Sequence, residues 1–275
     1  MLITFVALQR SFIYHPGPPG KASPADYGVA FEEVKFPSSD GVEISAWWLE
    51  HKDRKHSPVL FYCHGNGAVL SSLAQVSSIF FNFGWDVLLF DYRMYGKSGQ
   101  GNGKLSEELL QRDAESGYQW LIQRGTAESR IVVWGHSLGS SVAALLASRH
   151  RPAGLFLEGS FPSMFAMARE RYPEILVPPF LIFDRFATAE YLRQHSFPVM
   201  VLHASQDEVI PLTMGERVLE AISEPKRWVM IDGIGHNDFP AVIHSYRDLL
   251  VGSVKEWIER ASEAEKPSPA SLEIG

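Results

Sequence analysis

A serine within the sequence Gly-His-Ser-Leu-Gly, Ser137, is the side chain of this protein best placed for nucleophilic chemistry. The motif follows the apolar run Ile131–Trp134 and precedes a helical run starting at Leu138, so it predicts a sharp turn between a strand and a helix. The two glycines fit so tight a turn, because a Cβ there would collide with neighbouring backbone. Such a turn exposes the serine hydroxyl beside unsatisfied helix N–H groups. We therefore expect Ser137 to attack an acyl carbonyl.

A serine hydroxyl at its ordinary pKa needs a general base, and the base needs a group that orients it. With the nucleophile on such a turn, the acid and the histidine are expected later in the chain, in that order. Asp207 follows the apolar run Val199–Leu202, and His236 follows the run Trp228–Ile231. Loops at the carboxyl ends of such strands meet at one edge of a sheet. We therefore assign Asp207 as the acid and His236 as the base.

Both assignments have competing residues nearby. Glu208 is the alternative to Asp207, which we favour because its place in the turn makes it the more inward-facing carboxylate. His203 and His244 are the alternatives to His236, but the first belongs to a strand end and the second to a helix.

The oxyanion of a tetrahedral intermediate also needs hydrogen-bond donors. One is expected to be the backbone N–H of Leu138, directly after the nucleophile. The second is expected from the loop His64-Gly65-Asn66-Gly67, which follows the apolar run Val59–Cys63. We favour the N–H of Asn66, with that of Gly67 as the alternative.

An apolar interval at about residues 159–197 interrupts the alternation of strands and helices. Prolines at three positions cut it into short pieces, which predicts a small helical cap over one end of the sheet. More than half of its apolar residues are expected simply to pack on the sheet. A subset is predicted to line an acyl pocket, which favours esters of apolar acids: Phe161, Met164, Phe165, Tyr172, Phe180 and Phe183.

Short apolar runs that alternate with helical segments predict an α/β fold: one eight-stranded, mostly parallel sheet flanked by helices. The first two strands are separated by a turn sequence and should form an antiparallel hairpin. The expected strands are Phe31–Phe36, Val42–Leu49, Val59–Cys63, Asp86–Phe90, Ile131–Trp134, Gly154–Leu157, Val199–Leu202 and Trp228–Ile231. The expected helices are Ser71–Phe83, Ser106–Gln123, Leu138–His150, Leu212–Ile222 and Phe239–Ala261.

Composition narrows the class of protein. The 275 residues, with no internal linker, fit one domain. A formal net charge of -7 without clustered Lys and Arg argues against a nucleic-acid partner. The single cysteine, Cys63, excludes an internal disulfide and a multi-cysteine zinc site, and a buried structural thiol is its expected role. We expect no metal and no cofactor, a small-molecule or acyl substrate, and no particular oligomeric state.

The two ends of the chain differ in character. Met1–Leu8 is apolar but shorter than the roughly 20 residues of a spanning helix, and it lacks the features of a signal peptide. It is interpreted as a short element packed on the body, as an interfacial anchor in peripheral contact with a membrane, or as the stub of a removed membrane segment; we favour the first. Either a cytoplasmic or a membrane-associated protein fits. The tail Ala261–Gly275 is rich in charge, Pro and Ser, which predicts a mobile end.

Several stretches together resemble the serine hydrolases of the α/β-hydrolase superfamily, specifically the Bem46-like group, which is related to the protein depalmitoylases. They cover nearly the whole chain in order: Gln9–Pro16, Tyr62–Gly67, Asp91–Ser98, Gly135–Gly139, Asp184–Phe186, Ser205–Pro211 and Gly235–Asp238. The resemblance implies the same triad and the same oxyanion donors. It also implies that relatives carry a membrane segment just before the stretch that matches Gln9–Pro16. Met94 stands where the family usually has glycine.

These inferences favour a serine hydrolase that cleaves carboxylic esters through a Ser-His-Asp triad. An acyl-protein thioesterase at a membrane surface is the main alternative, followed by a peptidase or amidase. A non-catalytic ligand-binding protein with the same fold is a more distant alternative, because binding alone would not need the full set of catalytic groups.

Overall fold

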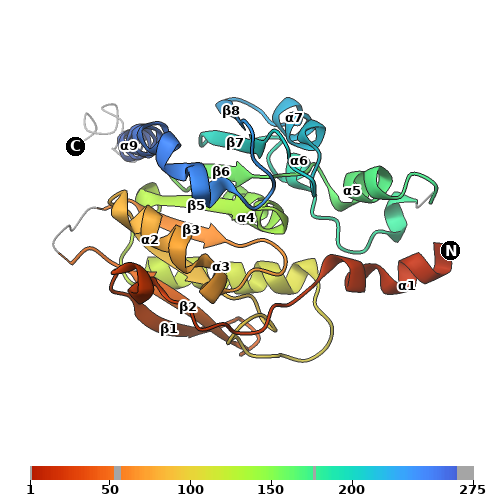
Figure 1. Cartoon of the computed structure of the whole chain (residues 1–275), viewed down its shortest axis with the longest axis horizontal. Coiled ribbons are helices and arrows are strands. Elements are labelled where there is room, and N and C mark those ends of the chain that lie inside the picture. Colours follow the sequence, from red (N-terminus) through yellow and green to blue (C-terminus); the bar gives the residue numbers. More distant parts are fainter. Residues whose placement is uncertain (1, 53–56, 176–177, 265–275) are drawn as a thin grey trace, which may run out of the picture.

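An eight-stranded sheet lies at the centre of the computed structural model, which describes residues 2–52, 57–175 and 178–264 (Figure 1). The strand order is β1-β2-β4-β3-β5-β6-β7-β8. The pairs β1–β2 and β2–β4 are antiparallel and all other pairs are parallel, which confirms the predicted sheet and its first hairpin. The strands are β1 (Glu32–Pro37), β2 (Glu43–Leu49), β3 (Val59–Cys63), β4 (Asp86–Phe90), β5 (Ile131–His136), β6 (Gly154–Glu158), β7 (Val199–Ala204) and β8 (Lys226–Ile231).

Helices cover both faces of the sheet. In β3, Val59 and Phe61 face a core shared with α3, α4 and α7, whereas Leu60 and Tyr62 face a second core shared with α2 and α9. The α-helices are α1 (Leu2–Ile13), α2 (Ala74–Asn82), α3 (Glu107–Gln123), α4 (Leu138–Arg149), α5 (Met164–Arg171), α6 (Thr188–Tyr191), α7 (Leu212–Ala221), α8 (Phe239–Val242) and α9 (Arg247–Ala264). The 3₁₀ helices are η1 (Pro24–Tyr27), η2 (Leu70–Leu73), η3 (Glu128–Arg130), η4 (Pro179–Leu181) and η5 (Ile243–Tyr246).

Three segments differ from the prediction or refine it. The helix expected over Phe239–Ala261 is divided into α8, η5 and α9. Helix α9 continues to Ala264, so the start of the expected mobile tail is helical, and residues 265–275 lie outside the described part. The interval at 159–197 consists of short pieces, α5, η4 and α6, between β6 and β7.

Helix α1 lies beside α5 at the end of the molecule where the parallel strands finish (Figure 1). This agrees with a short element packed on the body. Within the described ranges, every helix is too short or too polar to cross a membrane.

Candidate active site

Ser137 stands alone between the end of β5 and the start of α4. Its backbone has φ 54° and ψ -123°, a conformation that is rare for a residue with a side chain and that marks a strained turn. The flanking glycines permit this turn: a Cβ on Gly139 would lie 2.2 Å from the carbonyl oxygen of Cys63, and one on Gly135 would lie 2.4 Å from that of Gly139. The strand-to-helix turn expected from the sequence is therefore present.

Asp207 and His236 meet at the carboxyl ends of β7 and β8. The distance between Asp207 Oδ2 and His236 Nδ1 is 2.6 Å. The other oxygen, Oδ1, accepts the backbone N–H groups of Val209 at 2.9 Å and Ile210 at 2.7 Å. Burial raises the pKa of Asp207, but the hydrogen bonds from His236 and Ile210 outweigh it, so this pKa lies below its ordinary value. An ionised carboxylate thus holds the imidazole at its Nδ1 edge.

The contacts of the competing residues differ from those of Asp207 and His236. The carboxylate of Glu208 accepts the backbone N–H of His236 at 3.1 Å, so it orients the loop rather than the ring. His203 has no exposed side-chain surface, and burial lowers its pKa. Its Nε2 pairs with the carbonyl oxygen of Ile210 at 2.9 Å and lies 3.5 Å from Asp207 Oδ2, further than the 2.6 Å of His236 Nδ1. His244 lies in η5 with its ring 5.9 Å from that of Phe83.

The nucleophile turn and the histidine loop are directly connected. His136, the residue before Ser137, pairs through Nε2 with the carbonyl oxygen of His236 at 3.2 Å. The two imidazole rings lie 4.9 Å apart. Gly159, at the end of β6, leaves room for the base, because a Cβ there would lie 2.9 Å from His236 Cε1. Glu158, the last residue of β6, accepts the indole N–H of Trp134 at 2.8 Å, which indicates a structural role for this carboxylate.

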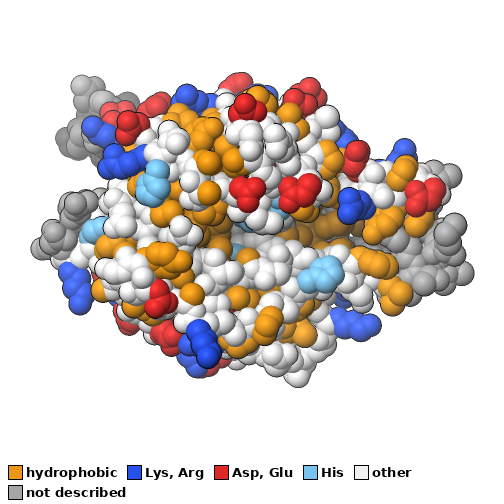
Figure 2. Space-filling view, in the orientation of Figure 1, with side chains coloured by type: hydrophobic (Ala, Val, Ile, Leu, Met, Phe, Trp, Pro, Cys, Tyr) orange, Lys and Arg blue, Asp and Glu red, His pale blue; other side chains and the backbone are white. Residues whose placement is uncertain are grey.

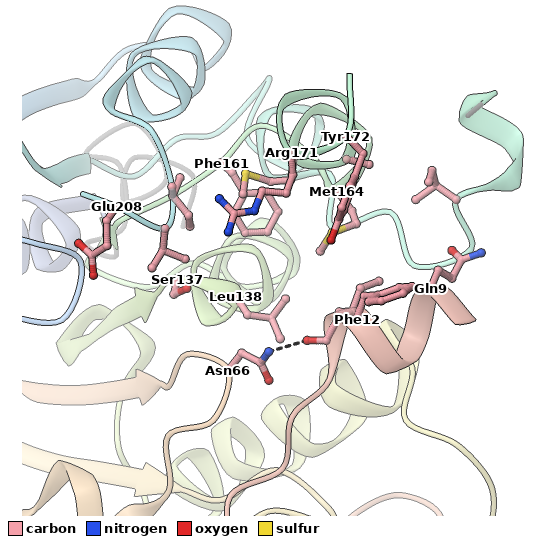
Figure 3. A pocket seen from close by; sticks show the side chains of 16 residues that line it. Gln9, Phe12, Asn66, Ser137, Leu138, Phe161, Met164, Arg171, Tyr172 and Glu208 are labelled. Atoms are coloured by element: carbon pink, nitrogen blue, oxygen red, sulfur yellow. Dashed lines mark hydrogen bonds between the residues drawn. The ribbon is translucent and has the colours of Figure 1, made fainter. Parts of the chain in front are cut away.

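The expected oxyanion donors lie beside Ser137. Leu138 is the first residue of α4, so its N–H has no acceptor one turn earlier in the helix. The loop after β3 approaches closely enough that a Cβ on Gly65 would lie 3.0 Å from Ser137 Cβ. Asn66 follows directly and lines the same cavity as Ser137 and Leu138 (Figure 3). The structure thus brings both residues to the cavity that contains Ser137, and their role as oxyanion donors stays a prediction.

The side chain of Asn66 has a role that sequence reasoning missed. It donates to the carbonyl oxygen of Ile13 at 2.6 Å and accepts the backbone N–H of His15 at 2.8 Å and the hydroxyl of Tyr95 at 2.9 Å. It therefore joins the end of α1 to the loop that carries the proposed oxyanion donor. The sequence feature that could have indicated this role is the position of Asn66, a polar residue between two glycines.

A cavity of about 320 Å³ opens beside Ser137, near the lower end of the range of roughly 300–1,000 Å³ for small-molecule sites. Its walls come from the loop after β3, α5, α1 and the loop that follows Asp207 (Figure 3). They are mostly apolar: Phe12, Ile13, Leu138, Phe161, Met164, Met167, Ala168, Ile182, Val209 and Ile210.

Three of the six predicted pocket residues line this cavity, namely Phe161, Met164 and Tyr172. The other three do not. Phe165 faces a separate depression beside Pro162, because successive residues of a helix point in different directions. Phe180 and Phe183 point to solvent, with 80% and 56% of their surface exposed.

Helix α1 supplies wall residues that the sequence did not predict: Gln9, Phe12 and Ile13. The Gln9 amide donates to the carbonyl oxygen of Leu181 at 3.0 Å and accepts the N–H of Phe183 at 2.9 Å. Arg10 pairs with Asp184 at 2.8 Å. These contacts join the start of the stretch Gln9–Pro16 to residues 181–184, at the start of the stretch Asp184–Phe186. They also hold the segment that carries Phe180 and Phe183, whose side chains point to solvent.

Comparison with known proteins identifies relatives along most of the chain. Residues 54–176 match the family model described as "Serine aminopeptidase, S33". An uncharacterized protein of Mycobacterium tuberculosis is 34% identical over 240 residues, which cover 86% of this chain and 84% of the other. The lysophosphatidylserine lipase ABHD12 of Danio rerio is 32% identical over 201 residues, 66% of this chain and 51% of that protein, so the match spans about half of the lipase.

Solved structures share the fold at low sequence identity. An esterase from Pyrococcus furiosus superposes with a TM-score of 0.72 at 19% identity, over 90% of this chain and 98% of the esterase. An esterase from Exiguobacterium antarcticum gives a TM-score of 0.64 at 15% identity, over 82% and 100% of the two chains. With the strand order, the nucleophile turn and the sequence relatives, these matches show that the chain belongs to the α/β-hydrolase superfamily and is related to ABHD12.

Proposed function

We propose that the protein is a serine esterase that hydrolyses carboxylic esters of apolar acids through Ser137, His236 and Asp207. The observation that carries this proposal is the pairing of Asp207 with His236, whose backbone carbonyl contacts His136, the residue before the strained serine that lines an apolar cavity. The related lipase ABHD12, named for action on a lysophospholipid, is consistent with an acyl substrate.

In the proposed reaction, Ser137 Oγ attacks the ester carbonyl while His236 Nε2 takes the hydroxyl proton. Asp207 holds the imidazole by Nδ1 and stabilises the imidazolium. The N–H groups of Leu138 and Asn66 receive the oxyanion. His236 then gives its proton to the departing alcohol, and water, activated by the same histidine, releases the acid from the acyl enzyme and restores Ser137.

Hydrolysis of p-nitrophenyl esters tests the nucleophile. Ser137→Ala should abolish turnover and labelling by a fluorophosphonate while the melting temperature changes little. Ser160→Ala, which removes a buried hydroxyl outside the cavity, serves as a control and should keep both. Full turnover by Ser137→Ala would overturn the assignment, and absence of labelling in the wild type would favour a ligand-binding protein.

The acyl-protein thioesterase and the peptidase remain rivals because the triad does not determine the leaving group. The apolar lining favours an acyl chain over a peptide. A matched series of ester, thioester and anilide with one acyl chain separates the three. We expect the ester to be turned over fastest; a kcat/KM at least tenfold higher for a palmitoylated peptide would favour the thioesterase.

We also propose peripheral contact with a lipid surface at the cavity mouth. Seven large apolar side chains are highly exposed among the described residues, and five of them belong to α1, the η4 segment or the loop after Asp207, near the cavity. They are Leu8, Phe12, Phe180, Phe183 and Val209. Hydrophobic side chains gather around a hollow at this end of the molecule (Figure 2). Clustered exposed apolar groups are typical of interaction sites.

Sedimentation with phosphatidylcholine vesicles tests this contact. Phe180→Ser with Phe183→Ser should reduce binding severalfold and leave hydrolysis of a dissolved short-chain ester unchanged. Tyr27→Ser with Met230→Ser, at two exposed apolar positions elsewhere, is the matched control. Equal binding of the wild type and the Phe variant would contradict the proposal.

A further inference from the structure

Arg171, the last residue of α5, forms part of the wall of the cavity that contains Ser137. Figure 3 shows its guanidinium group beside Phe161, directed toward Ser137 and away from α1. No other Lys or Arg among the described residues lines this cavity. The other charged lining residue is Glu208, whose carboxylate already accepts the His236 N–H.

A structural role for Arg171 is the simpler interpretation to consider first. A cation in the last turn of a helix interacts favourably with the helix dipole. Arg169 occupies the same last turn, yet it does not line the cavity. Within the described ranges no salt bridge engages Arg171. Stabilisation of the helix end therefore leaves its direction into the cavity unexplained.

The cavity has two chemically different parts, a cationic part at Arg171 close to Ser137 and an apolar part further from Ser137 (Figure 3). Phe12, Met164 and Ile182 form an apolar part between α1 and α5, which suits the acyl chain. With the carbonyl carbon at Ser137 and the acyl chain in the apolar part, Arg171 lies close to the ester bond, within reach of a charged group on the alcohol half. A guanidinium group binds phosphate or carboxylate oxygens through two parallel hydrogen bonds, and a partly enclosed site strengthens the attraction.

We propose that Arg171 selects esters whose alcohol half carries an anionic group, a phosphate or a carboxylate. This inference rests on the proposed esterase function and assigns its specificity. It also predicts that Lys at this position is an incomplete substitute, because an ammonium group keeps the charge but not the planar pair of donors.

Octanoyl esters of glycerol, glycerol 3-phosphate and glyceric acid, all below their critical micelle concentrations, provide the test. Arg171→Gln should lower kcat/KM for the two anionic esters by about tenfold, mainly through KM, and leave the glycerol ester within about twofold. For the anionic esters, the kcat/KM of Arg171→Lys should lie between those of the wild type and Arg171→Gln. Arg169→Gln is the matched control on the same helix turn and should change none of the three. A larger effect on the phosphate or on the carboxylate ester identifies the preferred anion.

Two outcomes would overturn the proposal. Equal losses on neutral and anionic esters would make Arg171 a packing residue, and equal effects of Arg169→Gln would reduce the result to general surface charge. Binding of octyl phosphate, measured by calorimetry, repeats the comparison without turnover and should weaken about tenfold in Arg171→Gln. If none of the esters is hydrolysed, the esterase function fails while this binding result still decides the role of Arg171.

Discussion

At the scale of single residues, three positions other than glycine have a positive φ in the described part of the chain: Met94 at 67°, Ser137 at 54° and Phe186 at 41°. Such backbone strain costs roughly 1–3 kcal/mol and persists where the surrounding structure imposes it. At Ser137 it presents the nucleophile. At Met94 it agrees with the glycine that the family resemblance implies there, since glycine has no Cβ to strain.

Two substitutions at Met94 separate strain from packing. The side chain is half-buried and packs against the core, so Met94→Ala and Met94→Gly both remove that contact. Only glycine also relieves the backbone strain of the positive φ at this position. We therefore expect Met94→Gly to be more stable than Met94→Ala by about 1 kcal/mol in urea unfolding. Equal stabilities would show that the turn adapts to a side chain without cost.

The neighbouring carboxylates Asp207 and Glu208 should differ sharply in their effects on catalysis. Asp207→Asn keeps the shape but removes the charge that holds His236 Nδ1, so kcat should fall by about 10³–10⁴-fold. Glu208→Gln retains an acceptor for the His236 N–H and should cost less than about tenfold. Steady-state kinetics on a short ester checks both variants. The reverse order of losses would make Glu208 the triad acid.

At the scale of elements, the strands of the sheet could be predicted from sequence because buried parallel strands are continuous apolar runs. Ser137, Asp207 and His236 could be selected from the sequence because each lies in the turn or loop that follows such a run, and their action as a triad stays a prediction. The residues of the cavity wall could not be predicted in this way. Gln9 contacts Leu181 across 172 positions of sequence, and no local pattern encodes which distant segment a helix will contact. The same limit applies to Phe180 and Phe183, whose outward direction depends on that contact.

His150 links three helical elements and should make their packing depend on pH. It lies at the end of α4, and its ring nitrogens pair with Glu115 of α3 at 2.9 Å and Glu128 of η3 at 3.1 Å. Hydrogen bonds that His150 donates to the Glu115 carboxylate raise the pKa of His150 above its ordinary value. A raised histidine pKa means that the stabilisation is complete below about pH 6.5 and is lost as pH rises through the folded-state pKa.

His150→Gln removes this titration. The difference in unfolding free energy between wild type and variant should be larger at pH 6 than at pH 8.5. Between the two pH values this difference should change by no more than about 1 kcal/mol, because the carboxylates of Glu115 and Glu128 are partly exposed and screened by solvent. Denaturant unfolding at the two pH values measures it. A difference that grows with pH would mean that His150 is neutral in the folded protein.

At the scale of the whole molecule, one buried cation joins parts of the chain that the sheet alone does not connect. Arg93, after β4, pairs with Asp113 of α3 at 2.7 Å and with Asp40 of the β1–β2 turn at 2.7 Å, and it also donates to Ser38. Its side chain is 2% exposed and that of Asp113 is fully buried. Burial lowers the pKa of Arg93, but the two carboxylates more than offset this and keep it charged.

Removal of this cation should therefore destabilise the entire fold. Arg93→Met leaves Asp113 buried without its partner, which costs about 3–5 kcal/mol, a large part of the roughly 5–15 kcal/mol that stabilises a domain. Adding Asp113→Leu to Arg93→Met removes the stranded carboxylate and should recover part of the loss, because a buried pair can be replaced by apolar groups at little cost. Denaturant unfolding of the single and double variants separates the cost of the stranded Asp113 carboxylate from the cost of losing the other contacts of Arg93. If the double variant is no more stable than Arg93→Met, the loss comes mainly from the contacts of Arg93 with Asp40 and Ser38, and the cation acts chiefly by linking the β1–β2 turn to the rest of the fold rather than by neutralising Asp113.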